Sequence, residues 1–346
     1  MQLFKESIMV AFAFVGVVVG AGFATGQEIF QFFTSNGIYS ISGIIVTGLI
    51  ITLAGVFVLN TGFVIQSHNH SESIRYYLHP IIARIFDIIL TLFLFSLAMI
   101  MTAGGASTIH ESFGLPYWLS SLILVLVILM TLFLKFERLI TVLGMVTPFL
   151  VIVVSIIAIY YFITGDLNFS ATNRFNKQHQ SLSLGWWFDG LNYASLQIAA
   201  AFSFLSVMGG RMQHRQSGLW GGLIGGIIIT LLLLMINFGL VTEFEHIQSV
   251  ALPTLLLASH ISPLLGTVMS IIMVLVIYNT IVGLMYAFAS RFTEPFSKGY
   301  FVLIIIMAII TFICTFIGFI SLIGKVFPIM GLFGFILLIP CLLYTS

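Results

Sequence analysis

Apolar stretches of about twenty residues follow one another along almost the whole of this chain, and they restrict its fold more than any other feature. A helix that crosses a bilayer needs about 20 mostly apolar residues. Only 7% of the 346 residues are charged and 60% are hydrophobic, whereas a soluble domain carries roughly 25% charged residues. Such a chain cannot cover a water-facing surface, so we predict an integral membrane protein with the lipid bilayer as its solvent.

Ten of these stretches are long enough to span, and we predict an all-α protein of about ten transmembrane helices. Isolated strands would leave unpaired backbone groups in hydrocarbon, which helices avoid. The predicted spans are residues 7–34, 38–65, 80–109, 116–134, 139–163, 187–209, 217–242, 263–290, 299–322 and 326–345.

Lysine and arginine are unevenly divided between the predicted loops. With the N-terminus inside, the inner segments hold Lys5, Arg75, Arg84, Lys135, Arg138, Arg211, Arg215, Arg291 and Lys298, and the outer segments hold Arg174, Lys177 and Lys325. Cytoplasmic loops carry the excess of basic residues in membrane proteins. We therefore predict a multi-pass protein of the cell (cytoplasmic) membrane with a cytoplasmic N-terminus.

A polar segment near the middle divides the chain into two halves. Residues 1–163 form the first five-helix half, 164–186 an extracellular linker, and 187–346 the second five-helix half. Because each half has five spans, the two have opposite topology, as in inverted-repeat transporters. A second outer segment, 243–262, is expected to carry a short interfacial helix. The chain ends with almost no polar tail, which is consistent with a truncated C-terminus.

The first span holds four glycines within eleven residues, Gly16, Gly20, Gly22 and Gly26. Glycine costs about 1 kcal/mol relative to alanine inside a helix, so one interpretation is a local break. Irregular backbone at membrane depth is tolerated where it lines a cavity, and there it can hold ions or solutes. The alternative is close helix packing, because both glycine pairs have small-xxx-small spacing. Glu28, a carboxylate within the span, favours a binding site.

The sixth span also carries polar residues and poor helix formers. Gly190, Asn192, Ser195 and Gln197 lie within it. Two interrupted helices at matching places in inverted halves indicate a transport site, so we predict a second break here. A polar cluster that joins helices is the alternative. In the eighth span, oxygens of Asn279 and Thr280 are candidate sodium ligands, since hard cations prefer oxygen; a threonine can instead bond its own backbone.

The segment from Gly16 to Ile29 resembles the first helix of YkvI-type bacterial membrane proteins. These are relatives of the amino acid–polyamine–organocation superfamily and look like the five-plus-five inverted-repeat group of LeuT-type sodium symporters. The resemblance implies discontinuous helices 1 and 6 around a central site. It implies sodium ligands from the carbonyls of Gly16 and Val19 with Thr280, and a substrate facing Ala21 and Gly22. Phe23 replaces the asparagine of the sodium symporters, which speaks against a second sodium site.

We therefore predict an ion-coupled symporter of a small organic solute, an amino acid or an amine, working by alternating access. Glu28 or Asp189 would meet an ammonium group, and sodium, or else protons, would drive uptake. The candidate substrate-binding residues are Gly20, Ala21, Gly22, Thr25, Glu28, Asn192, Tyr193, Ser195 and Gln197. The candidate sodium ligands are Gly16, Val19, Asn279 and Thr280.

Other function classes fit the sequence less well. An ion channel would need a continuous polar stripe, and a non-transporting protein with a packed glycine-rich first helix is a further alternative. No His-Glu-x-x-His motif or paired aspartates occur within the spans, so we do not expect an enzyme. The two cysteines, Cys314 and Cys341, are expected to be packing residues. We expect no cofactor beyond a sodium ion and no nucleic-acid partner, and the oligomeric state cannot be derived.

Overall fold

A computed structural model describes residues 2–67, 70–133, 146–165, 169–179, 184–294 and 296–343, and in these residues every regular element is a helix. Seven of these helices are long and apolar enough to cross a membrane, and Tyr117–Phe133 and Pro148–Thr164 are shorter apolar helices. The all-α, multi-pass prediction is therefore confirmed. The count of ten spans, the division into inverted halves and the orientation stay predictions.

The helices follow one another with short connections. The first part of the chain forms α1 (Gln2–Val18), α2 (Ala21–Thr25), α3 (Gln27–Phe32), the 3-10 turn η1 (Thr34–Asn36), α4 (Tyr39–Val64), α5 (His70–Tyr77), α6 (Pro80–Phe113), α7 (Tyr117–Phe133), α9 (Val146–Thr164) and α10 (Ser170–His179). The rest forms α11 (Trp186–Arg211), α12 (Arg215–Thr242), α13 (Phe244–Ile247), α14 (Pro253–Ile261), α15 (Pro263–Phe292), α16 (Lys298–Thr315) and α17 (Phe319–Leu343).

Each predicted span overlaps at least one of these helices, and α14 occupies the place of the expected interfacial helix. Parts of the predictions lie outside the described residues. These parts are residue 134, residues 139–145 and 344–345 of the spans, residues 166–168 and 180–183 of the linker, and the basic residues Lys135 and Arg138.

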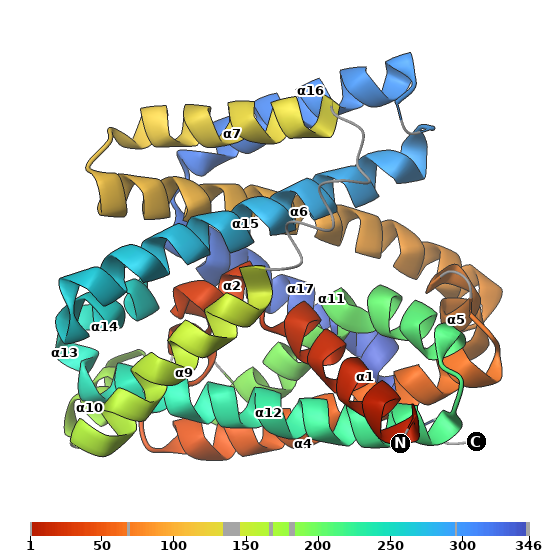
Figure 1. The fold of residues 1–346 in the computed structure, drawn as a ribbon, viewed down its shortest axis with the longest axis horizontal. Coiled ribbons are helices and arrows are strands. Elements are labelled where there is room, and N and C mark those ends of the chain that lie inside the picture. The colour runs from red at the N-terminus through yellow and green to blue at the C-terminus, as the bar shows by residue number, and fades with distance from the viewer. Residues whose placement is uncertain are drawn as a thin grey trace.

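The long helices pack in two groups, with the broken first span between them. α1, α4, α11 and α12 pack on one another, and α6, α7, α15 and α16 form the other group. Figure 1 shows the second group across the top of the view, α1, α4 and α12 across the bottom, and α2 between them. α2 contacts α6 and α15 of the second group, while α17 bridges the groups through α11, α4 and α6. The centre of the molecule is thus where the two groups meet.

The predicted break in the sixth span is wrong, because α11 runs without interruption from Trp186 to Arg211. Gly190 of this helix allows α11 to pack closely against α4. A Cβ atom at Gly190 would lie 2.9 Å from the carbonyl oxygen of Gly43 in α4, so a larger residue would push the two helices apart. A poor helix former therefore fits here without a break.

The polar residues of α11 that suggested this break bond to a neighbouring helix. The side-chain amide of Asn192 donates to the Pro328 carbonyl at 3.1 Å. The Ser195 hydroxyl donates to the Gly331 carbonyl at 2.6 Å. Both acceptors belong to α17, so these two side chains hold α11 against α17, which is the alternative that the sequence left open.

The boundary between the last two spans also differs from the prediction. α16 ends at Thr315 and α17 begins at Phe319, whereas the predicted loop comprises residues 323–325. The chain turns at Gly318, whose φ of 90° lies in the left-handed region that glycine tolerates. Lys325 consequently lies within α17 and not in an outer loop. The residues around the true turn are apolar, so composition gives no sign of it.

Candidate functional site

The first span is broken at its glycines, as predicted. α1 ends at Val18, and Gly20 has extended backbone angles (φ −96°, ψ −159°). The Gly20 N–H donates to the Val18 carbonyl at 2.9 Å, and not to Gly16, which would be its partner in a continuous helix. The carbonyl of Gly16 therefore loses its usual donor at the centre of the protein.

A second interruption follows one short helix later, at Gly26. Its φ is 75°, and a Cβ atom there would lie 2.6 Å from the Thr254 side chain of α14. The Thr254 hydroxyl donates to the carbonyl of Ala24 near the end of α2. Since helix ends leave carbonyls without intrahelical donors, this bond from α14 stabilises the broken segment. Sequence reasoning missed Thr254, because its partner is more than two hundred residues away.

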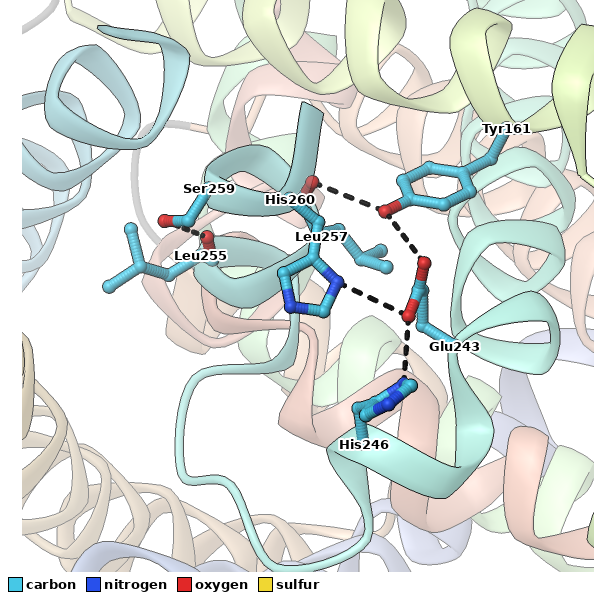
Figure 2. Close-up of polar contacts among 7 residues, drawn as sticks. All are labelled: Tyr161, Glu243, His246, Leu255, Leu257, Ser259 and His260. Atoms are coloured by element: carbon cyan, nitrogen blue, oxygen red, sulfur yellow. Dashed lines mark hydrogen bonds and ion pairs between the residues drawn. The ribbon is translucent and has the colours of Figure 1, made fainter. Parts of the chain in front are cut away.

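One carboxylate holds α14 in place (Figure 2). Glu243, at the end of α12, lies 3.0 Å from the Nδ1 atom of His246 and 3.2 Å from that of His260. The Tyr161 hydroxyl of α9 lies within 3.4 Å of the same carboxylate and 3.3 Å from the Leu257 carbonyl of α14. The side chain of Glu243 therefore links α9, α12, α13 and α14 beside the broken helix.

Glu28, in the first turn of α3, lies at the broken segment and is only 5% exposed. Its Oε2 atom accepts hydrogen bonds from the Gln197 amide at 3.1 Å and the Tyr193 hydroxyl at 3.3 Å, both from α11. A Cβ atom at Gly22 would lie 1.5 Å from the Glu28 Oε1 atom. The carboxylate therefore occupies the space that a side chain at Gly22 would fill.

Among the residues that the structure describes, no basic side chain is paired with the Glu28 carboxylate. Its hydrogen-bond donors are neutral groups. A buried carboxylate within a membrane span is costly, and such residues mark sites for ions, protons or substrates.

A cavity of about 80 Å³ lies beside this carboxylate. It is lined by Gly20, Gly22 and Glu28 of the broken span, Gln197 of α11 and Thr280 of α15. Apolar residues complete the wall, among them Phe93, Leu97 and Met101 of α6, Leu196 and Ala200 of α11, and Phe327 of α17. The cavity thus lies where the two helix groups meet. Its apolar wall could not be predicted, because such residues resemble every other residue of a spanning helix.

The structure does not bring all the candidates to this cavity. Thr25 is fully buried and its hydroxyl donates to the Gly22 carbonyl at 2.8 Å. Val19 is also fully buried. Asn192 and Ser195 face α17, as described above. Gly16 and Asn279 are not among the cavity-lining residues, and the predicted contact of the Ala21 side chain lies outside what the structure describes. Thr280 donates to the Val276 carbonyl of its own helix at 2.9 Å.

A larger cavity of about 560 Å³ is lined by residues of α3, η1, the start of α4, α10, the start of α11 and α17. The Asp189 carboxylate in its wall accepts a hydrogen bond from Asn36 at 2.9 Å. Two buried amide oxygens of lining residues, those of Gln27 and Asn192, have no hydrogen-bond partner among the residues that the structure describes. Phe30, Trp186 and other aromatic residues complete the wall. α3 therefore separates two cavities, each with one carboxylate.

Within the part of the chain that the structure describes, no three His, Cys, Asp or Glu residues are placed to hold a metal ion. The site is instead a buried carboxylate with amide and hydroxyl groups at a break in a membrane helix. The fold and the site together define an all-helical, multi-pass membrane protein with a discontinuous first span.

No family model matches the chain, but full-length relatives exist. The chain is homologous to two proteins of Bacillus subtilis (strain 168). It is 26% identical to the uncharacterized membrane protein YkvI over 93% of this chain and 91% of that one. It is 24% identical to the uncharacterized protein YyaD over 95% and 94% of the two chains. The predicted resemblance to YkvI-type proteins is thus confirmed.

Solved structures with the same fold include three proteins of low sequence identity to this chain. Mhp1, in an inward-facing conformation, aligns with a TM-score of 0.62 at 14% identity, covering 96% of this chain and 73% of that one. A manganese transporter of Eremococcus coleocola gives 0.56 at 15% identity over 91% and 70%. A Na⁺-coupled sialic acid symporter gives 0.50 at 11% over 96% and 85%. These matches show that the chain shares the helical fold of LeuT-type transporters, whereas the inverted repeat stays a prediction.

Proposed function

We propose that this protein is a secondary transporter that carries a small organic solute across the membrane by alternating access. The observation that carries the proposal is Glu28, which is buried at the break in the first span beside a cavity between two helix groups. Two relatives in fold, the manganese transporter and the sialic acid symporter, are transporters by name.

The solute carries an ammonium group, as an amino acid or an amine does. A carboxylate with only neutral hydrogen-bond donors attracts a cation, and an ammonium group can donate to its free oxygen. The wall opposite is largely apolar, which fits an organic body more than a hydrated inorganic ion. The cavity of about 80 Å³ is smaller than the 300–1,000 Å³ or so that is typical of ligand pockets, so binding requires the helix groups to separate.

The larger cavity supplies a route to this site. Its residue Gln27 precedes Glu28 in α3, so a small movement of α3 would join the two spaces. The Asp189 carboxylate places a negative charge along this route, as Glu28 does at the site. The aromatic side chains of the wall attract organic cations through the faces of their rings. A channel would instead need polar residues in an unbroken line across the membrane.

Sodium is the proposed coupling ion. The Gly16 carbonyl, which loses its usual donor, and the Thr280 hydroxyl are oxygen ligands of the kind that sodium prefers. Val19 and Asn279 stay candidates from the sequence. A proton carried by Glu28 is the alternative, and it would make sodium unnecessary.

A ligand screen tests this function. The thermal midpoint of the purified full chain would be measured with a panel of amino acids and amines, in sodium and in choline buffers. A ligand at a hundred times its Kd stabilises the folded state by about 2.7 kcal/mol. We expect an ammonium-bearing solute to raise the midpoint by a few degrees, and by more in sodium than in choline.

The matched pair of variants is Glu28→Gln and Glu245→Gln, which remove one carboxylate each from a buried and an exposed position. We expect the first to abolish the ligand shift and uptake into proteoliposomes, and the second to keep both. Uptake that survives in Glu28→Gln would show that the carboxylate does not bind the solute. Equal shifts in sodium and choline would favour proton coupling.

A further inference from the structure

A third cavity lies away from the transport site, between α5 and the first turns of α6. Its volume is about 420 Å³, and it is lined by Ile74, Arg75, Pro80, Ala83, Arg84 and Asp87. Figure 1 shows α5 beside the start of α6. Two exposed arginines, Arg75 and Arg84, therefore line this cavity from two different helices, and we call it the arginine hollow.

The two helices hold these arginines on a rigid base. The hydroxyl groups of Tyr77 in α5 and Thr61 in α4 lie 2.5 Å apart. Ser73 of α5 lies equally close to Ser206 of α11. Pro80 occupies the first position of α6, where its fixed φ suits a helix start. The spacing of the arginines is thus set by tertiary contacts and not by a loose loop.

The charge of the hollow is positive. Its one carboxylate, Asp87, is bonded by Arg291 of α15 at 3.0 Å, and the same guanidinium donates to the Thr91 hydroxyl at 2.7 Å. Three arginines and one aspartate leave a balance of two positive charges. Among described residues, no ion pair joins Arg75 or Arg84 to a carboxylate.

The surface beside the hollow is apolar. Ile81, Ile82, Ile85 and Ile88 of α6 are between 46% and 67% exposed. In a membrane helix such a face contacts acyl chains. Tyr76 of α5 is also exposed, and tyrosine is enriched where the hydrocarbon meets the headgroups. In a bilayer, this exposed face would contact the acyl chains and place the arginines beside it at headgroup level.

We propose that this hollow is a binding site for an acidic phospholipid. Its phosphate would lie between Arg75 and Arg84, because a guanidinium donates two parallel hydrogen bonds to phosphate oxygens. Its acyl chains would lie along the isoleucines of α6. Basic pockets between membrane helices are known to hold acidic headgroups. Lipid binding here is independent of the transport proposed above, since Glu28 lies outside this hollow.

Native mass spectrometry of the delipidated full chain in detergent tests the site, with palmitoyl-oleoyl phosphatidylglycerol and the matching phosphatidylcholine as probes. One basic residue near a membrane surface contributes about fivefold in affinity. We therefore expect Arg75→Gln and Arg84→Gln each to weaken phosphatidylglycerol binding about fivefold, and the double variant roughly 30-fold. Phosphatidylcholine binding should not change.

The control is Arg174→Gln with Lys177→Gln, which removes two exposed positive charges from α10. The proposal is wrong if this control loses as much affinity as the double variant, or if the double variant keeps its preference for phosphatidylglycerol. Displacement of the lipid by inorganic phosphate or glycerol phosphate at equal concentration would identify a site for a free anion and would also overturn it.

Two further measurements do not depend on how well the double variant folds. Arg75→Lys with Arg84→Lys keeps both charges and should retain most of the preference for phosphatidylglycerol. In the unaltered protein, this preference should fall as NaCl rises from about 50 to about 500 mM, because salt screens exposed charges. A preference that salt leaves unchanged would contradict a site formed by the arginines.

Discussion

The position of the Glu28 carboxylate depends on the absence of a side chain at Gly22. The two residues are six positions apart, and a continuous helix would not bring the end of one side chain onto the Cα atom of the other. The extended backbone at Gly20 and the left-handed turn at Gly26 interrupt the helix on both sides of α2, and Oε1 lies against Gly22. Glycine at this position therefore serves the site and not only helix packing.

Gly22→Ala tests this dependence. A Cβ atom would meet the end of the Glu28 side chain at 1.5 Å, and because that side chain is flexible, the carboxylate would move and the fold would survive. We expect solute affinity to fall at least about tenfold, which corresponds to about 1.4 kcal/mol. Binding would be measured by the ligand-induced thermal shift, and folding by size-exclusion chromatography.

The control for this variant is Gly283→Ala, an exposed glycine within α15 that lines none of the three cavities. A Cβ atom at Gly283 would have no neighbour within 4 Å, and alanine is the better helix former. Solute affinity should stay the same and stability should not fall. If both alanine variants bind the solute like the original protein, the contact between Gly22 and Glu28 has no role in binding.

At the scale of elements, α14 determines how firmly the broken span is held. Removing the Thr254 hydroxyl leaves the Ala24 carbonyl without this donor, at a cost of about 0.5–1.5 kcal/mol. In Thr254→Val we therefore expect hydrogen exchange of residues 21–26 and 253–261 to speed up by about threefold to tenfold, measured by mass spectrometry. Thr267→Val is the control, because that exposed hydroxyl bonds the Pro263 carbonyl of its own helix. Equal effects of the two variants would mean that α14 is held by other contacts.

Glu243→Ala should have a wider effect than Thr254→Val. It removes the acceptor shared by His246, His260 and Tyr161, so both α13 and α14 lose a contact. We expect faster exchange in residues 244–247 as well as 253–261. Glu245→Ala should change neither, since its pair with Arg174 is exposed and such surface pairs contribute at most about 1 kcal/mol. Unchanged exchange in Glu243→Ala would contradict the linking role shown in Figure 2.

The sequence predicts one broken helix correctly and the other wrongly, for a physical reason. In the first span, glycines and a carboxylate coincide, and the carboxylate needs the space that the glycines leave. In α11 the same residue types serve close contact with α4 and hydrogen bonds to α17. A single sequence cannot separate these uses, because the partner lies on a distant segment. Gln197 and Thr280 were predicted from their polarity, whereas Leu97 and Phe327 of the same cavity carry no such signal.

At the scale of the whole molecule, the cavity lies where two helix groups meet, and this arrangement permits movement of one group against the other. α2 contacts α6 and α15, while α1 packs on α12. The break in the first span therefore lies between α1, which packs on the group of α4, α11 and α12, and α2, which contacts the group of α6 and α15. Alternating access requires one group to move against the other, and a break at this place would allow such movement without bending a continuous helix.

Access to Leu97 distinguishes these two cases. Leu97 is a half-buried residue of α6 that lines the cavity across from Glu28. In a background with Cys314→Ala and Cys341→Ala, we expect a membrane-impermeant thiol reagent to label Leu97→Cys, because opening of the groups exposes the cavity to water. A solute at about ten times its Kd should slow this labelling about tenfold, because bound solute fills the cavity that Leu97 and Glu28 share in all but about a tenth of the molecules. Lys177→Cys on the exposed face of α10 should be labelled at the same rate with and without solute. If Leu97→Cys is never labelled, or if solute leaves its rate unchanged, the two helix groups do not move apart and the protein is a static bundle around a small cavity.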